Sequence, residues 1–99
     1  MTSKQRSYLK SLASNLDPVF QVGKADVTPE LVNAISEALE ARELIKINVL
    51  KNCETDPKEV GLMLESRTRS ECVQVIGRKI VLYRQAKDPK QRKIVLPVK

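Results

Sequence analysis

The stretch "FQVGKADVTPELV", residues 20–32, joins three kinds of local structure. The stretch opens on the end of a short strand predicted at Val19–Val22, and Thr28-Pro29 begins a helix, because threonine caps helix N-termini and proline is favoured at the first helical position. The tetrapeptide Gly23-Lys24-Ala25-Asp26 lies between them as a glycine-led loop. Free backbone N–H groups and the helix dipole at such a junction favour an anion. The stretch therefore predicts a strand-loop-helix unit that either turns the chain or holds a phosphate.

Outward from this unit, hydrophobic periodicity predicts the remaining elements. A helix with Ser3 as its N-cap ends at Asp17-Pro18, and "LIKINVL", residues 44–50, alternates as a half-buried strand. Asp56-Pro57 opens a third helix that ends near Arg67. The segments "CVQVIG" and "IVLY" form a hairpin around a tight turn at residues 77–79.

The resulting order is α-β-α-β-α-β-β, which is an α/β class. Right-handed crossovers make the first three strands parallel, and the last strand is antiparallel, so we expect a four-stranded mixed sheet in a two-layer sandwich. In so short a chain we expect all helices on one face of the sheet. The other face would then be polar and carry Gln21, Lys46, Asn48 and Gln74.

The length of 99 residues allows one core, so residues 1–84 are expected to form a single domain. Residues 85–99 change composition and predict a basic, partly mobile tail whose "IVLPV" docks back on the domain. The glutamates off the buried stripe of the second helix are interpreted as a solvated acidic face; they are Glu30, Glu37, Glu40 and Glu43.

Positive charge is concentrated at the two ends of the chain. Residues 1–24 have a net charge of +3, residues 25–76 of −4, and residues 77–99 of +7. Such asymmetry favours a polyanionic partner, and nucleic acid is the commonest one, although a solvated basic tail would have the same composition. Aromatic residues make up only 3%, which disfavours a single-strand binder that relies on stacking.

Several function classes lack the residues they need. The chain has no histidine, and Cys53 and Cys72 form no CxxC pair, so neither a zinc site nor a Cys-His nucleophile can be assembled. No Walker loop and no Ser or Cys beside a base is present. We expect no catalytic residue, no metal and no cofactor. The first residues lack an apolar signal core and no run is long enough to span a membrane, so we expect a cytoplasmic protein.

Parallel strands deliver the loops that follow them to one edge of the sheet. Here these loops are residues 23–26, Lys51-Asn52, and Gly77-Arg78-Lys79. Distant segments would thus converge as a basic rim beside the N-terminus of the second helix. This convergence depends on the parallel pairing of the strands.

The runs "VGKADVTPELV", "ELIKINVLKN" and "CVQVIGRKIVLYR" resemble the CRM domain (chloroplast RNA splicing and ribosome maturation) in its stand-alone bacterial YhbY-like form. The similarity covers about residues 3–97. It implies a fold similar to the C-terminal domain of translation initiation factor three. It also implies association with large-subunit ribosomal precursors and, in plant organelles, with group II introns.

This resemblance implies a GxxG loop at residues 23–26. Gly23 and Lys24 match the motif, whereas Asp26 replaces the second glycine. Aspartate can adopt the left-handed conformation that glycine would supply, but we expect its carboxylate to lie where a phosphate would approach. In "TRSE", residues 68–71, Arg69 replaces the glycine of a TGA-like turn.

Three hypotheses follow. The first is a non-enzymatic RNA-binding ribosome-assembly factor that is monomeric and recognises structured RNA by shape. The second is a protein-interaction module that docks on a ribosomal protein or an assembly GTPase through the acidic helix face and Asp26. The third, an enzyme, has the least support. The candidate RNA-binding residues are Gly23, Lys24, Ala25, Asp26, Lys51, Arg78 and Lys79, with Lys4, Arg6, Lys10, Lys46, Arg84 and Arg92 widening the footprint.

Overall fold

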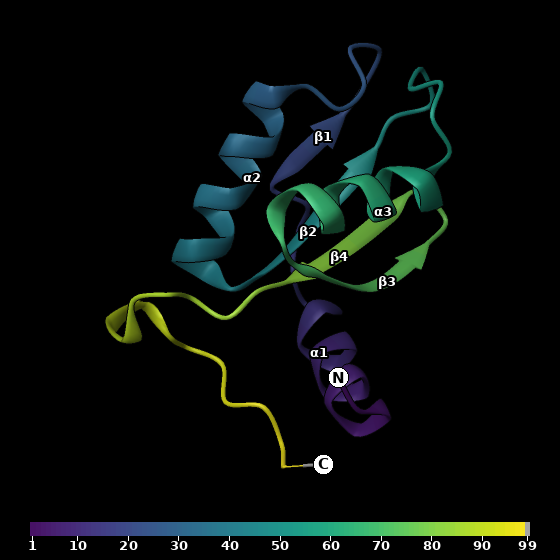
Figure 1. Ribbon diagram of the computed structural model, residues 1–99. Helices are drawn as coiled ribbons and strands as arrows, with labels where there is room; N and C mark the ends of the chain where they lie inside the picture. Colours follow the sequence, from purple (N-terminus) through teal and green to yellow (C-terminus); the bar gives the residue numbers. More distant parts are fainter. Residues whose placement is uncertain (99) are drawn as a thin grey trace.

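The computed structural model describes residues 1–98 and contains the predicted elements in the predicted order (Figure 1). The helices are α1 (Ser3–Ala13), α2 (Pro29–Arg42) and α3 (Pro57–Thr68), and the strands are β1 (Phe20–Val22), β2 (Leu44–Val49), β3 (Glu71–Ile76) and β4 (Lys79–Tyr83). One 3₁₀ turn, η1 (Pro89–Gln91), lies in the tail. The predicted α/β class with a mixed sheet is confirmed. None of the helices in residues 1–98 is long and apolar enough to cross a membrane.

The helices begin at the residues that cap them. The Thr28 hydroxyl accepts a hydrogen bond from the Leu31 backbone N–H at 3.1 Å, and Asp56 precedes α3. The N-cap of α1 is Thr2 rather than the predicted Ser3. Thr2 and Gln5 form a reciprocal capping box, in which each side chain accepts from the backbone of the other.

The strand order in the sheet is β1-β2-β4-β3. The first three strands run in the same direction, as predicted, but β4 lies antiparallel between β2 and β3. The reason is the two-sided apolarity of β4. Ile80 and Leu82 are fully buried on one face, while Val81 and Tyr83 are at least 94% buried on the other. A strand that is apolar on both faces belongs in the centre of a sheet.

The larger core lies between the sheet and the pair α2 and α3. Ile35 and Leu39 of α2, and Val60 and Leu64 of α3, are fully buried against this face. From the strands it receives the alternating apolar residues Ile45, Ile47, Val49, Ile80 and Leu82. The buried residues of this core are aliphatic apart from Cys53, as the low aromatic content predicts, and the half-buried Phe20 packs against them.

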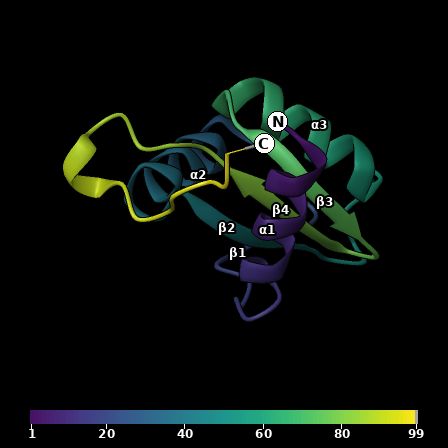
Figure 2. The ribbon, with the colours of Figure 1, turned by 90° about the horizontal axis from the view of Figure 1, so that it is seen from below.

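The expectation that all helices cover one face is wrong. Helix α1 packs on the second face, where Leu9 and Ala13 contact a smaller core with Leu44, Val73 and Val81. In the view from below, α1 crosses in front of the sheet (Figure 2). The physical reason is that Val73, Val81 and Tyr83 would otherwise expose their apolar surface to water. Helix α1 covers only part of this face, and the part toward the strand-to-helix loops stays open.

The tail returns to the domain and completes this smaller core. Ile94 and Leu96 pack against it, and the Gln5 side-chain amide donates to the Pro97 carbonyl at 3.0 Å. The tail near Pro97 therefore lies beside the first turn of α1 (Figure 1). The docking of "IVLPV" follows the expectation, while the division of the chain at residue 84 stays a prediction.

The sequence suggested that Glu43 is solvated, but this residue is fully buried, with 0% of its surface exposed. It ends α2 with a positive φ of 66°, and its side chain is buried. Its carboxylate accepts hydrogen bonds from the backbone N–H groups of Ala86, Lys93 and Ile94 at 2.6–2.9 Å. Glu40 similarly accepts from the N–H groups of residues 87 and 88. Two glutamates of the predicted acidic face thus hold the tail.

Burial alone would raise the pKa of Glu43, but the three backbone donors and the nearby Arg92 lower it below the ordinary value of 4.5. Because the carboxylate is favoured in the folded state, its contribution to stability is full above the unfolded-state pKa. That contribution is lost as the pH falls through the lower pKa of the folded state.

We predict that Glu43→Gln lowers the free energy of unfolding at neutral pH by about 2–3 kcal/mol, because buried N–H donors lose their charged acceptor. The substitution also flattens the acid limb of stability below about pH 4.5. Urea unfolding as a function of pH measures both effects, with the exposed Glu37→Gln as control. Equal effects of the two substitutions would contradict this role of Glu43.

Arg69 occupies the left-handed position (φ 55°) that ends α3, where the resemblance implied glycine. A left-handed conformation costs a side-chain-bearing residue about 1–2 kcal/mol. We predict that Arg69→Gly raises the free energy of unfolding by about 1 kcal/mol, whereas Arg67→Gly, inside the last turn, lowers it by about the same amount. Thermal unfolding compares the two variants, and a change in the same direction in both would overturn the interpretation.

Candidate nucleic-acid interface

Three loops meet at one edge of the sheet, which we call the loop edge: residues 23–26 after β1, residues 50–56 after β2, and the Gly77-Arg78 turn between β3 and β4. The Leu50 N–H donates to the Val22 carbonyl at 2.8 Å, and the Val49 N–H donates to the Arg78 carbonyl at 2.7 Å. These bonds join all three segments. The geometry predicted from parallel strands is therefore present.

Gly23 allows the first two loops to approach each other. A Cβ atom at this position would lie 3.3 Å from Leu50 Cδ1, slightly tighter than ordinary van der Waals contact, and 3.4 Å from Asn52 Oδ1, at the limit of such contact. In the third loop, Gly77 has φ 57° and permits the two-residue hairpin turn. Both glycines thus shape the loop edge itself.

Asp26 adopts the left-handed backbone conformation (φ 61°) that the second glycine of a GxxG loop would supply. Its carboxylate accepts a hydrogen bond from the Val27 N–H at 2.9 Å and another from the Thr55 hydroxyl. Both of its oxygens therefore have partners inside the protein, while the expectation that this carboxylate lies in the path of a phosphate stays a prediction. Lys24 and Ala25 are the exposed residues of the loop.

Thr55 was not singled out from the sequence. It precedes Asp56-Pro57 and by itself indicates only a turn before a helix. Its bond to Asp26 ties the loop after β1 to the loop after β2, across 29 positions of sequence. Only the folded chain brings these two residues together.

The open part of the second sheet face continues the loop edge. The strand register aligns Gln21, Asn48, Lys79 and Ile76 in one row across all four strands. The Lys79 Nζ donates to Asn48 Oδ1 at 2.8 Å. The next row consists of Lys46, Val81 and Gln74. The four polar residues predicted for this face therefore lie on it, where α1 leaves it uncovered.

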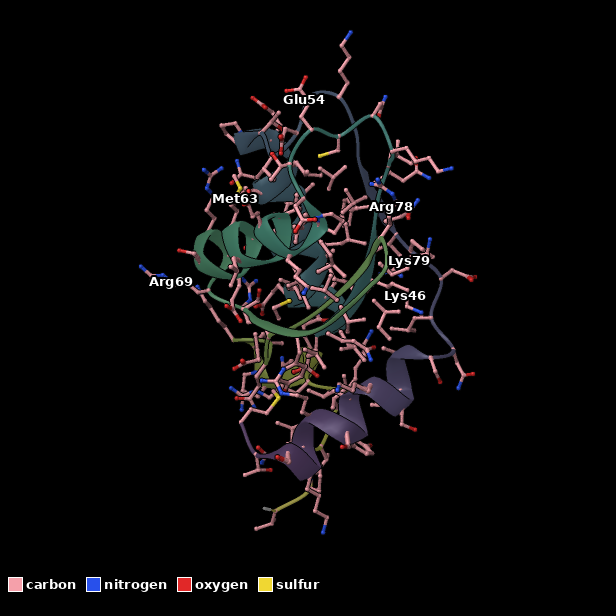
Figure 3. The ribbon with its side chains drawn as sticks, turned by 90° about the vertical axis from the view of Figure 1, so that its right-hand side faces the viewer. Lys46, Glu54, Met63, Arg69, Arg78 and Lys79 are labelled. Carbon is pink, nitrogen blue, oxygen red and sulfur yellow. The ribbon has the colours of Figure 1, made fainter. Side chains whose placement is uncertain are left out.

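The basic side chains follow this surface in order. Figure 3 shows Arg78, Lys79 and Lys46 along the side of the sheet that faces away from Met63 of α3. The Arg78 guanidinium donates to the Leu50 carbonyl at 3.2 Å and remains exposed. Lys24 and Lys51 are exposed on the neighbouring loops, and Lys10 borders the surface from α1. These six residues form what we call the basic surface.

Three of the predicted basic residues lie away from this surface and make hydrogen bonds within the fold. Arg84 is half-buried and donates to the Ser36 hydroxyl and carbonyl and to the Thr68 carbonyl at 2.6–3.0 Å. Arg6 donates to the Cys72 and Val73 carbonyls and forms an ion pair with Glu71 at 3.4 Å.

Arg92 donates through Nε to the Ala86 carbonyl at 2.9 Å, in the tail segment that Glu43 holds. It lies with Arg84 beyond the end of β4 opposite the loop edge. Lys4 is exposed in the first turn of α1. Helix α1 begins away from the loop edge (Figure 1). The basic surface is therefore smaller than the set of residues predicted from the sequence.

The sequence matches a known protein family over most of its length. The CRS1/YhbY (CRM) domain matches residues 1–84. The chain belongs to the CRM domain family. The "Probable RNA-binding protein YqeI" of Bacillus subtilis is 50% identical over 91 residues, which cover 92% of this chain and 95% of that protein. A Haemophilus influenzae protein named "RNA-binding protein" is 34% identical and covers 91% of each chain.

A solved structure agrees with the CRM fold described above. The solution structure of the hypothetical protein SAV1595 of Staphylococcus aureus, described as a candidate RNA-binding protein, has 48% sequence identity and a TM-score of 0.78. The similarity covers 98% of this chain and 99% of that one. The resemblance inferred from the sequence motifs is thus confirmed for both family and fold.

The bond between Asp26 and Thr55 gives a testable prediction for the loop edge of this CRM domain. Asp26→Gly and Thr55→Val each remove it, so their effects on the free energy of unfolding should be non-additive by about 1 kcal/mol. Urea unfolding of the two single variants and the double variant measures this coupling. Strict additivity would show that the bond does not link the loops in solution.

Proposed function

We propose that this protein is a non-enzymatic RNA-binding protein whose basic surface contacts the sugar-phosphate backbone of structured RNA. The observation that carries the proposal is the convergence of Lys24, Lys51, Arg78 and Lys79 at one edge, beside the N-terminus of α2. Positive side chains and a helix N-terminus at one place favour phosphate groups. Relatives over nearly the whole chain carry names that include RNA binding.

The inward turn of the Asp26 carboxylate supports a working phosphate-binding loop. Its charge is engaged by Thr55 and by the Val27 N–H, which leaves Lys24 as the charged side chain exposed at the loop tip. These contacts support a loop that still accepts an anion although Asp26 replaces the second glycine of the GxxG pattern.

The family resemblance supports a more specific role. We propose a monomeric, cytoplasmic factor that associates with large-subunit ribosomal RNA precursors during ribosome assembly. Phosphate contacts position a protein without reading sequence, so recognition at the loop edge would depend on RNA shape.

The alternative is a module that docks on a ribosomal protein or GTPase through an acidic helix face. Two observations weaken it. Glu40 and Glu43 of that face bind the tail, and Asp26 is turned inward. Survival of ribosomal-particle binding after RNase treatment would favour this alternative.

A charge-matched pair of triple variants tests the RNA proposal. We predict that alanine at Lys24, Arg78 and Lys79 weakens binding to large-subunit ribosomal RNA fragments by at least about tenfold at moderate salt. It also reduces the log-log salt slope by about 2–3, because each lost phosphate contact removes about 0.7–0.9 from the slope. Fluorescence anisotropy over a salt series measures both quantities.

The control is alanine at Arg67, Lys87 and Lys90, which removes the same charge from exposed positions outside the basic surface. We expect this control to change affinity by less than about twofold, because long-range effects of net charge are screened. Equal losses in the two triple variants, or equal wild-type affinity for matched duplex DNA, would refute the proposal.

A further inference from the structure

A pocket of about 300 Å³ lies between the end of α1 and the open sheet face. Its charged side chains are Lys10, Lys46 and Lys79, which come from α1, β2 and β4. No single segment of the sequence indicates this cluster, because the three lysines are more than thirty positions apart. The packing of α1 on the second face creates the pocket.

The rest of the lining differs in character from the lysines. Gln74 is half-buried and presents a side-chain amide, which can both donate and accept hydrogen bonds. Ile76 is 61% exposed and offers an apolar surface at the open side. Ala13 and Val81 are nearly buried and contribute the apolar base. The pocket therefore combines positive charge, a two-way hydrogen-bonding group and an apolar surface.

We propose that this pocket holds one unpaired nucleotide of a bound RNA, and that Gln74 reads its base. The three lysines suit the phosphates on either side of the nucleotide, and Ile76 suits the face of the base. The volume is at the lower end of the range of about 300–1,000 Å³ for small-molecule sites, which limits the occupant to a single nucleotide.

Lys79 connects this pocket to the loop edge. It lies in the first position of β4, directly after the Gly77-Arg78 turn, and also lines the pocket. An RNA strand whose phosphates follow Arg78 would reach the pocket without leaving the basic surface. The inference thus rests on the proposed RNA-binding function and adds a subsite to it.

The low aromatic content of the chain is compatible with this subsite. Stacking on phenylalanine or tyrosine is one way to hold a splayed base, but hydrogen bonding to the exposed base edge is another. Here Ile76 replaces an aromatic platform, so the charge of the lysines and the Gln74 amide carry most of the binding. Loss of the amide should therefore affect base preference more than total affinity.

The test compares hairpin RNAs that are identical except for one bulged nucleotide. We expect wild-type protein to bind the bulged hairpin about tenfold more tightly than the fully paired one, and to distinguish the four bulged bases by about threefold or more. Gln74→Leu, which keeps the size but removes the amide, should abolish the distinction between bases. Lys10→Ala with Lys46→Ala should reduce the preference for the bulge.

Gln21→Leu is the matched control, because Gln21 lies on the same sheet face but on β1, outside the pocket. It should leave base discrimination unchanged. Circular dichroism melts of all variants establish that they are folded. Loss of discrimination in Gln21→Leu as well would overturn the assignment of base reading to Gln74.

The remaining outcomes separate the two proposals. Wild-type protein that binds bulged and paired hairpins equally, with Gln74→Leu unchanged, overturns the pocket inference and leaves the proposed function standing. Absence of RNA binding refutes the proposed function itself. Free nucleoside monophosphates that compete as well as the bulged hairpin, with the same dependence on Gln74, would identify a mononucleotide site and overturn an RNA subsite.

Discussion

The buried carboxylate of Glu43 determines how the tail reaches the second sheet face, where it packs beside α1. It lies at the junction between α2 and β2 and accepts three backbone N–H groups from the tail. A buried carboxylate without partners would be strongly unfavourable, so the tail must follow the path that supplies these donors. That path brings Ile94 and Leu96 onto the second face beside α1. One residue thus ends α2 and holds the tail at residues 86, 93 and 94.

This arrangement leaves one end of the sheet held by internal hydrogen bonds and the other end, the loop edge, with exposed basic side chains. Beyond the C-terminal end of β4, Arg84 and Arg92 make intramolecular hydrogen bonds, and glutamates hold the tail. At the loop edge the basic side chains are exposed and few of their donors are engaged within the protein. Some basic side chains are thus engaged within the fold and others are exposed, and net charge alone does not separate the two groups.

The loop after β1 shows how a departure from a motif can be accommodated. Asp26 supplies the left-handed backbone that the motif assigns to glycine, and Thr55 engages the charge that the substitution introduces. The loop keeps its shape through a side chain from another loop. A motif match that considers residues 23–26 alone would miss this compensation.

The sequence alone determined the elements, their order and the convergence of three loops. Caps such as Thr28-Pro29 and the alternation of residues 44–49 are local signals, and parallel strands leave little choice about where their loops lie. Only the tertiary structure decided the position of β4, the placement of α1, and the burial of Glu43. Periodicity reports which side of an element is apolar, but it does not report which other element covers that side. The lysine pocket and the roles of Arg6 and Arg84 depend on those long-range choices, and so no local pattern could predict them.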